Sequence, residues 1–229
     1  MNVRDLGGLP TADGRIIRRG ALVRADALDR LSPEGWAALE AHGVRTVIDL
    51  RNDDELGEDA APRPPGLTTL HLPLDGLEDH DFWQHWLGRP EFGTPHYYGP
   101  WLERFPDRAA RVLAAIARAE GGGVAYHCGI GRDRTGLVTM LVLAALGVPP
   151  ELIVEDYARS EGRVPPSPEL DAFWAAHPSS PREVLAGVLA RVDPGAYLEP
   201  GDLSALRARA LSAAGRRSPP AGATPRPAR

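Results

Sequence analysis

The segment HCGIGRDRTG, His127 to Gly136, holds the only cysteine of the chain, between an apolar strand and an apolar helix. Gly129 and Gly131 follow Cys128, and Arg134 stands six positions after it. A glycine-rich turn before a helix can direct backbone N–H groups and the positive helix end at one anion. An arginine adds two parallel hydrogen bonds to phosphate oxygens. The same donors would hold a cysteine as thiolate, so the pattern predicts a nucleophile aimed at phosphate.

The simpler interpretation of a lone cysteine is a small buried core residue, because most free cysteines are of this kind. Here a histidine, two glycines, an arginine and a threonine all stand at useful positions between one strand and one helix. That coincidence favours the catalytic interpretation of Cys128.

The segment resembles the Cys-x5-Arg phosphate loop of the protein tyrosine phosphatase superfamily. It is most similar to a bacterial branch whose loop is His-Cys-x-x-Gly-Lys-Asp-Arg-Thr-Gly. Further stretches resemble that branch in the same order, over roughly residues 2 to 165: NVRDLGG at 2–8, the run 19–26, VIDLR at 47–51 and EDYARS at 155–160. The resemblance implies a phosphocysteine mechanism without metal or cofactor, acting on phosphotyrosine. It extends the candidate substrates to phosphoserine, phosphothreonine and phosphoinositides.

The same resemblance implies a role for each residue of the loop. Cys128 would be the nucleophile and Arg134 the phosphate clamp. The remaining phosphate-binding positions would be Gly129, Ile130, Gly131, Arg132 and Asp133, through their backbone amides. His127 would help to fix the loop and favour the thiolate, or be only a satisfied core histidine. Thr135 would donate its hydroxyl to Cys128 and ease departure of the thiolate, or only cap the helix.

Arg132 departs from the branch, which has lysine at this position. The positive charge is kept, but a compact ammonium is replaced by a planar guanidinium. This difference weakens the expectation of phosphoinositide hydrolysis.

An alkyl oxide leaving group needs a proton donor, and two aspartates are candidates. Asp133 lies inside the loop, where the resemblance places an aspartate implicated in acid catalysis. Asp75 follows the predicted strand 67–74. Asp79 and Asp81, a few positions later, are weaker candidates for the same role. Asp133 could instead orient a loop arginine, Arg51 or Arg132, and Asp75 could be a solvated turn residue. We favour Asp133.

Other polar residues receive structural interpretations. Asp5, with two glycines after it, is expected to fix a turn near the phosphate loop, with substrate contact as an equal alternative. His80, His85 and His96 lack the spacing of a metal site and are expected at the surface.

The elements that must position this loop follow an α/β order. Asp13-Gly14 favours a hairpin turn in the N-terminal part. A buried strand is predicted at 45–50, and further strands at 67–74 and 123–128. Helices are predicted at 33–42, 106–122, 135–147, 150–161, 167–177, 180–192 and 201–214, with a partly helical segment at 75–98. The order predicts a central, mainly parallel sheet flanked by helices, like the type II phosphotyrosine protein phosphatases that the resemblance implies.

Composition agrees with one globular domain. The chain has 229 residues, 43% hydrophobic and 25% charged, which suits one large globular domain or two small ones. With the resemblance, a single phosphatase domain is expected over residues 1–212, with its catalytic loop at 127–136. Residues 213–229 are rich in arginine and proline and are expected to be a disordered basic tail.

Charge and hydropathy exclude several partners. The formal net charge is −5 and no basic stripe is present, which argues against nucleic acid. The N-terminus lacks the apolar segment of a signal peptide, and the longest apolar run, 137–148, is too short to insert stably in a membrane. A cytoplasmic protein acting on phosphorylated proteins is therefore expected, with signal-independent export left open.

Three alternatives compete with a protein phosphatase. A phosphoinositide phosphatase would use the same loop, and a phosphate-binding module would have lost turnover. Arsenate reductase or sulfurtransferase chemistry is disfavoured, because no second cysteine exists for a reductive relay.

Overall fold

The computed structural model describes residues 1–163 and 167–213. Its centre is a five-stranded sheet in the order β1-β2-β5-β3-β4. The strands are β1 (Arg4–Asp5), β2 (Leu22–Ala25), β3 (Val44–Asp49), β4 (Thr68–His71) and β5 (Gly123–His127). All neighbours are parallel except β1, which runs antiparallel to β2. The predicted mainly parallel α/β sheet is confirmed.

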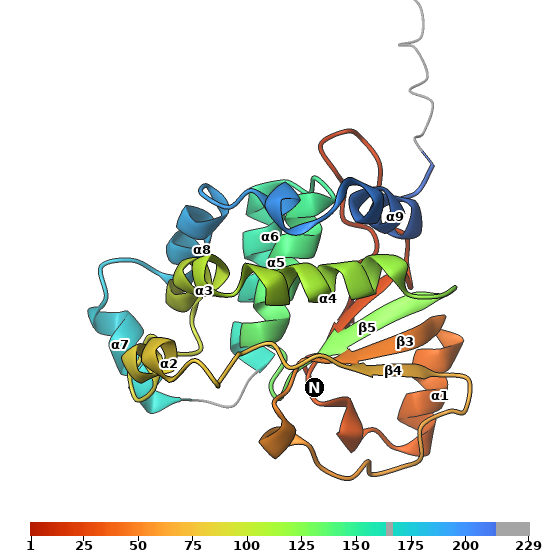
Figure 1. The fold of residues 1–229 in the computed structure, drawn as a ribbon, viewed down its shortest axis with the longest axis horizontal. Helices are drawn as coiled ribbons and strands as arrows, with labels where there is room; N and C mark the ends of the chain where they lie inside the picture. Colours follow the sequence, from red (N-terminus) through yellow and green to blue (C-terminus); the bar gives the residue numbers. More distant parts are fainter. Residues whose placement is uncertain (164–166, 214–229) are drawn as a thin grey trace, which may run out of the picture.

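Helices cover both faces of this sheet (Figure 1). In the described residues they are α1 (Pro33–Ala41), α2 (His80–Trp86), α3 (Tyr98–Arg104), α4 (Pro106–Arg118), α5 (Asp133–Ala145), α6 (Pro150–Ala158), α7 (Pro168–Ala176), α8 (Pro181–Leu189) and α9 (Pro200–Ala210). Several begin as the sequence predicts: Ser32 caps α1 and accepts a hydrogen bond from the Gly35 amide, and Ser180 with Glu183 forms the capping box of α8.

Alternation along the strands divides the core into two layers. Val47 and Ala125 point to the face covered by α1, where Trp36 packs. Their neighbours Ile48 and Tyr126 point to the opposite face, where α4 and α5 pack. Successive strand residues face opposite sides of a sheet, so each buried strand serves both layers. This double burial explains why apolar side chains follow one another at Val47–Ile48 of β3 and Val124–Tyr126 of β5.

The N-terminal hairpin is confirmed only in its turn and pairing. Pro10 bridges Ile16 across the Asp13-Gly14 turn, and Gly14 has a φ of +83°. The second arm, however, continues into β2, which pairs in parallel with β5 and so becomes an interior strand of the sheet. The strand predicted at 67–74 is shorter, because only Thr68–His71 pair with β3.

The single-domain boundary at 212 stays a prediction. The predicted tail, from residue 214 onward, lies outside the described residues. Within residues 1–163 and 167–213, no helix combines the length and the apolar character needed to cross a bilayer.

Candidate active site

Cys128 follows β5 at the edge where the parallel strands end. His127 is in register with Ala25 at the end of β2 and with Asp49 at the end of β3. Loops after the carboxyl ends of parallel strands form the usual binding edge of an α/β sheet. The Cys128 side chain is buried there, with 1% of its surface exposed.

Helix α5 places a hydroxyl directly beneath the thiol. Thr135 Oγ1 donates a hydrogen bond to Cys128 Sγ over 3.1 Å, and both residues are buried. The first turn of α5 starts at Asp133, so the unpaired N–H groups and positive end of the helix dipole lie beside the loop. This arrangement can stabilise a negatively charged sulfur.

The loop is held from outside through its carbonyl groups. Asn2 Nδ2 donates to the carbonyls of Ile130 and Gly131 at 3.2 and 3.0 Å. Arg24 Nη2 donates to the Gly131 carbonyl at 2.7 Å. In a trans peptide the C=O and the following N–H point in opposite directions. Anchoring these carbonyls therefore directs the next amides, those of Gly131 and Arg132, away from the anchors.

Glycine is required at position 131 by both backbone angle and space. Its φ is +70°, a left-handed conformation that other residues rarely adopt. A Cβ there would lie 2.8 Å from the Ala25 carbonyl oxygen and the Asp26 nitrogen. The loop can thus pass tightly over the end of β2.

The anchoring arginine belongs to a buried ionic network. Arg24, fully buried, donates to Asp156 Oδ2 at 2.6 Å, and Arg4 Nε donates to Asp156 Oδ1 at 2.7 Å. Ser160 accepts from both arginines. Burial alone would raise the pKa of Asp156, but Arg24 and Arg4 outweigh it and hold the pKa below its usual value. Asp156 is therefore ionised, and its negative charge offsets the positive charges of Arg4 and Arg24 beneath the loop.

Removing Asp156 should destabilise the fold strongly. Asp156→Ala leaves Arg24 buried without its counter-charge, a change that costs about 3–5 kcal/mol of unfolding free energy. Urea unfolding measures this, with Asp59→Ala as a control, because Asp59 pairs with Arg63 near the surface. The control should lose less than about 1 kcal/mol. Equal unfolding midpoints for the two variants would contradict the assignment.

Arg134 is positioned by acids that lie far away in the sequence. Its guanidinium forms a bidentate pair with Glu55, with Nη2 2.6 Å from Oε1 and Nη1 bonded to Oε2. Asp75 Oδ2 lies 3.2 Å from the same Nη1. A guanidinium has five N–H donors, so this pairing leaves donors for a bound phosphate.

Asp75 and Glu55 are linked by Asn52. Asn52 Nδ2 donates to Asp75 Oδ2 at 2.8 Å and to Glu55 Oε2 at 3.0 Å. Burial, opposed by Arg134 and Asn52, raises the pKa of Asp75. Asp75 is thus a buried carboxyl beside Arg134, not a solvated turn residue.

Asp133 is the first residue of α5 and stands between Arg132 and Arg134. Its Oδ1 accepts a hydrogen bond from Arg132 Nε at 2.8 Å, and its carbonyl accepts one from the Tyr98 hydroxyl at 2.7 Å. Burial raises the pKa of Asp133, although Arg132 opposes the shift. Of the two arginines considered for pairing with Asp133, the structure brings only Arg132 to it.

His127 is fully buried behind the thiol. Its Nδ1 lies 3.3 Å from the Cys128 carbonyl oxygen and its Nε2 lies 3.6 Å from Asp49 Oδ2. Burial lowers the pKa of His127, and the adjacent Asp49 offsets the shift only in part. His127 is therefore a neutral ring at neutral pH. Asp49 also accepts a hydrogen bond from Arg51, which binds Asp29 as well and does not reach Asp133.

Two structural interpretations need correction. Asp5 binds the Gly20 amide at 2.8 Å and His42 at 2.9 Å, where β2 and β3 begin, so it lies at the sheet edge opposite Cys128. Asp5 does fix the N-terminal turn, because its Oδ1 accepts a hydrogen bond from the Gly7 amide at 2.8 Å. Its predicted place near the phosphate loop was wrong, because Asn2 reaches that loop instead. His96 is half-buried and stacks on Trp174, which differs from the predicted surface position.

The weaker acid candidates do not join the site. Asp79 caps α2 and pairs with Arg104 at 2.5 Å, away from Arg134. Asp81 stands in the first turn of the same helix. The residues that sequence reasoning missed are Glu55, Asn52 and Arg24. Arg24 and Asp156 did lie within segments that resemble the phosphatase branch, and that was the available signal.

A model of the tyrosine phosphatase family matches residues 1–199 of the chain. The chain belongs to the tyrosine phosphatase family. A putative tyrosine-protein phosphatase of Cupriavidus necator is 32% identical over 168 residues, 71% of this chain and 61% of the relative. A tyrosine-protein phosphatase of Nostoc commune is 33% identical over 153 residues, 66% of this chain and 52% of the relative.

Mycobacterium tuberculosis PtpB, named a triple specificity protein phosphatase, is 32% identical over 191 residues, 72% of this family member and 68% of PtpB. The chain thus spans between 52% and 68% of the length of these relatives. Among solved structures, P. aeruginosa TpbA in complex with pTyr aligns over 78% of this chain and 91% of its own. The identity is 16% and the TM-score 0.41.

Proposed function

We propose that the protein is a cysteine-dependent phosphatase that hydrolyses phosphotyrosine in proteins without a metal ion. The observation that carries the proposal is the hydroxyl of Thr135 bonded to Cys128 Sγ at the base of a loop that ends at Arg134. Family membership and relatives named tyrosine-protein phosphatases support it. The name of PtpB supports extending the candidate substrates to phosphoserine and phosphothreonine.

The reaction has two displacements. The Cys128 thiolate attacks phosphorus and the tyrosyl oxygen leaves, taking a proton from a carboxylic acid. Backbone amides of residues 129–134 and the Arg134 guanidinium bind the three equatorial oxygens. Water then attacks the phosphocysteine and gives a proton to the carboxylate left by the first step, so the P–S bond breaks, inorganic phosphate leaves, and both the thiolate and the carboxylic acid re-form. The Thr135 hydroxyl, which donates to Cys128 Sγ, stabilises this departing thiolate and so favours the second step.

The proton donor of the first step is Asp133 in this proposal, with Asp75 as the alternative. Asp133 is part of the loop itself, so its carboxyl is fixed relative to the bound phosphate. Burial raises the pKa of both aspartates, which increases the protonated fraction near neutral pH. A general acid with a raised pKa suits this task.

The pH profile separates the two donors. A group that must be protonated makes kcat fall as the pH rises through its pKa. Asp133→Asn should remove this alkaline fall and lower kcat on a phosphoserine peptide by about 10²- to 10⁴-fold, with a smaller loss on an aryl phosphate. Asp75→Asn is the matched comparison. If only Asp75→Asn removes the alkaline fall, Asp75 is the donor.

The proposed activity is tested with p-nitrophenyl phosphate in EDTA, with and without vanadate. We expect turnover in EDTA and inhibition by vanadate, which mimics phosphate in the loop. No turnover would indicate a phosphate-binding module. Release of phosphate from inositol lipids in preference to phosphotyrosine peptides would indicate a lipid phosphatase.

A further inference from the structure

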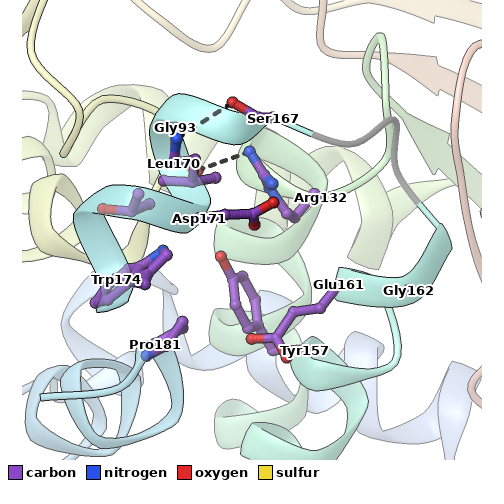
Figure 2. Close-up of a pocket in the computed structure, with 11 residues that line it drawn as sticks. Gly93, Arg132, Tyr157, Glu161, Gly162, Ser167, Leu170, Asp171, Trp174 and Pro181 are labelled. Atoms are coloured by element: carbon purple, nitrogen blue, oxygen red, sulfur yellow. Dashed lines mark hydrogen bonds between the residues drawn. The ribbon is translucent and has the colours of Figure 1, made fainter. Parts of the chain in front are cut away.

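A second cavity adjoins the phosphate loop. It has a volume of 490 Å³ and is lined by Arg132, Tyr157, Glu161, Leu170, Asp171 and Trp174, among others. Ligand pockets usually measure about 300–1,000 Å³, so this space is large enough for a side chain of a bound peptide. We call it the acidic pocket. Figure 2 shows the side chains of Arg132, Tyr157 and Asp171 directed into the same space.

The charge inside the acidic pocket is negative. Among the described lining residues the guanidinium of Arg132 is the one cation, against the two carboxylates of Glu161 and Asp171, and it is held by Asp133 at 2.8 Å and by the Gly93 carbonyl. Asp171 and Glu161 are exposed, and neither carboxylate has a hydrogen bond or ion pair within residues 1–163 and 167–213. A cation could pair with both carboxylates, whereas a phosphate would be repelled by them.

Arg163 does not line the pocket, and two other neighbouring basic groups do not reverse this balance. Arg182 follows Pro181 of the pocket wall but pairs with Glu155 at 3.0 Å. His96 stacks on Trp174 with ring centroids 5.2 Å apart. Burial, with a further contribution from His177, lowers the pKa of His96, so this ring is neutral at neutral pH.

The aromatic wall suits a cation as well. Trp174 and Tyr157 both line the acidic pocket. One face of the Trp174 indole is covered by His96, and a cation can be attracted only by a ring face that is left open. The aliphatic part of a lysine or arginine side chain can pack against the same rings and Leu170.

We propose that the acidic pocket binds a lysine or arginine that flanks phosphotyrosine in the protein substrate. The proposal rests on the proposed phosphatase function, because it assigns a specificity site to that reaction. Arg132 lies four positions after Cys128 in one loop, so the two sites share a wall. An extended peptide advances about 3.3–3.6 Å per residue, so a residue within a few positions of phosphotyrosine can reach the pocket.

Matched phosphotyrosine peptides test the proposal. Lysine, glutamine or glutamate is placed in turn at each of the three positions on either side of phosphotyrosine, and kcat/KM is measured. At one or more positions we expect lysine to exceed glutamate by about fivefold, as for two exposed ion pairs. Within each variant, kcat/KM of the lysine peptide is divided by kcat/KM of the glutamate peptide, so a general loss of activity cancels.

The ratio should fall to about one in the double variant Glu161→Gln/Asp171→Asn. Glu169→Gln is the control, because Glu169 is an exposed acid on the same helix α7 that does not line the pocket. Its ratio should stay at the native value.

Equal hydrolysis of lysine and glutamate peptides, with p-nitrophenyl phosphate turned over, would overturn this proposal and leave the phosphatase function intact. Preference for glutamate peptides or inositol lipids, lost in Arg132→Ala, would show an anion site and overturn it as well. Absence of all turnover would instead contradict the phosphatase function.

Discussion

Cys128→Ser is expected to lower kcat for phosphotyrosine peptides by roughly 10⁴- to 10⁶-fold, the scale of loss when a covalent nucleophile is removed. The serine hydroxyl can occupy the same place above Thr135 Oγ1, which lies 3.1 Å from Sγ in the native protein. A hydroxyl, however, is not ionised by the cradle at neutral pH, so it cannot attack phosphorus at a useful rate. Single-turnover phosphate release measures the loss.

The serine variant should still bind phosphate ligands, because the loop amides and Arg134 are unchanged. Urea unfolding is the accompanying control. The variant should unfold at the midpoint of the native protein, since the substitution changes one buried atom. Turnover within tenfold of the native protein would exclude Cys128 as the nucleophile.

Arg134→Lys is expected to lower kcat by about 10²- to 10³-fold, as for the loss of one preorganised donor group to a developing oxyanion. Lysine keeps the positive charge beside Glu55 and Asp75 but cannot form two parallel hydrogen bonds to phosphate. The bidentate pair with Glu55 is lost for the same reason. Because the positive charge beside the two carboxylates is kept, the substitution should lower kcat more than it lowers the free energy of unfolding.

Arg63→Lys is the matched control for this substitution. Arg63 pairs with Asp59 near the surface, and its replacement should leave kcat within twofold of native and cost at most about 1 kcal/mol. A kcat for Arg134→Lys that equals the control value would show that Arg134 contributes only charge. The phosphate clamp would then have to be another group.

The sequence predicted the part of the site that is contiguous. Cys128, Arg134 and Thr135 lie in one strand–turn–helix segment, so their closeness in the sequence already predicts that they lie close together in space. The parallel strands around Val47 and Ala125 were also predictable, because both of their faces are buried and the runs are apolar.

Other parts depend on tertiary contacts that no local pattern records. Glu55 precedes Arg134 by 79 positions, and only the parallel pairing of β3 with β5 brings their loops together. The segment that contains β2 was interpreted as a hairpin arm because it follows the Asp13-Gly14 turn. A buried arginine is tolerated there since Asp156, itself 132 positions away, and the Gly131 carbonyl bind its guanidinium.

The central claim is a covalent bond between phosphorus and Cys128 Sγ during turnover. Native protein mixed with p-nitrophenyl phosphate, quenched within the first turnover and analysed by mass spectrometry, tests it directly. We expect one phosphoryl group on the peptide that contains Cys128, at the amplitude of the p-nitrophenol burst, and none in Cys128→Ser. A phosphoryl group on any other residue, or one that persists in the serine variant, would contradict the mechanism.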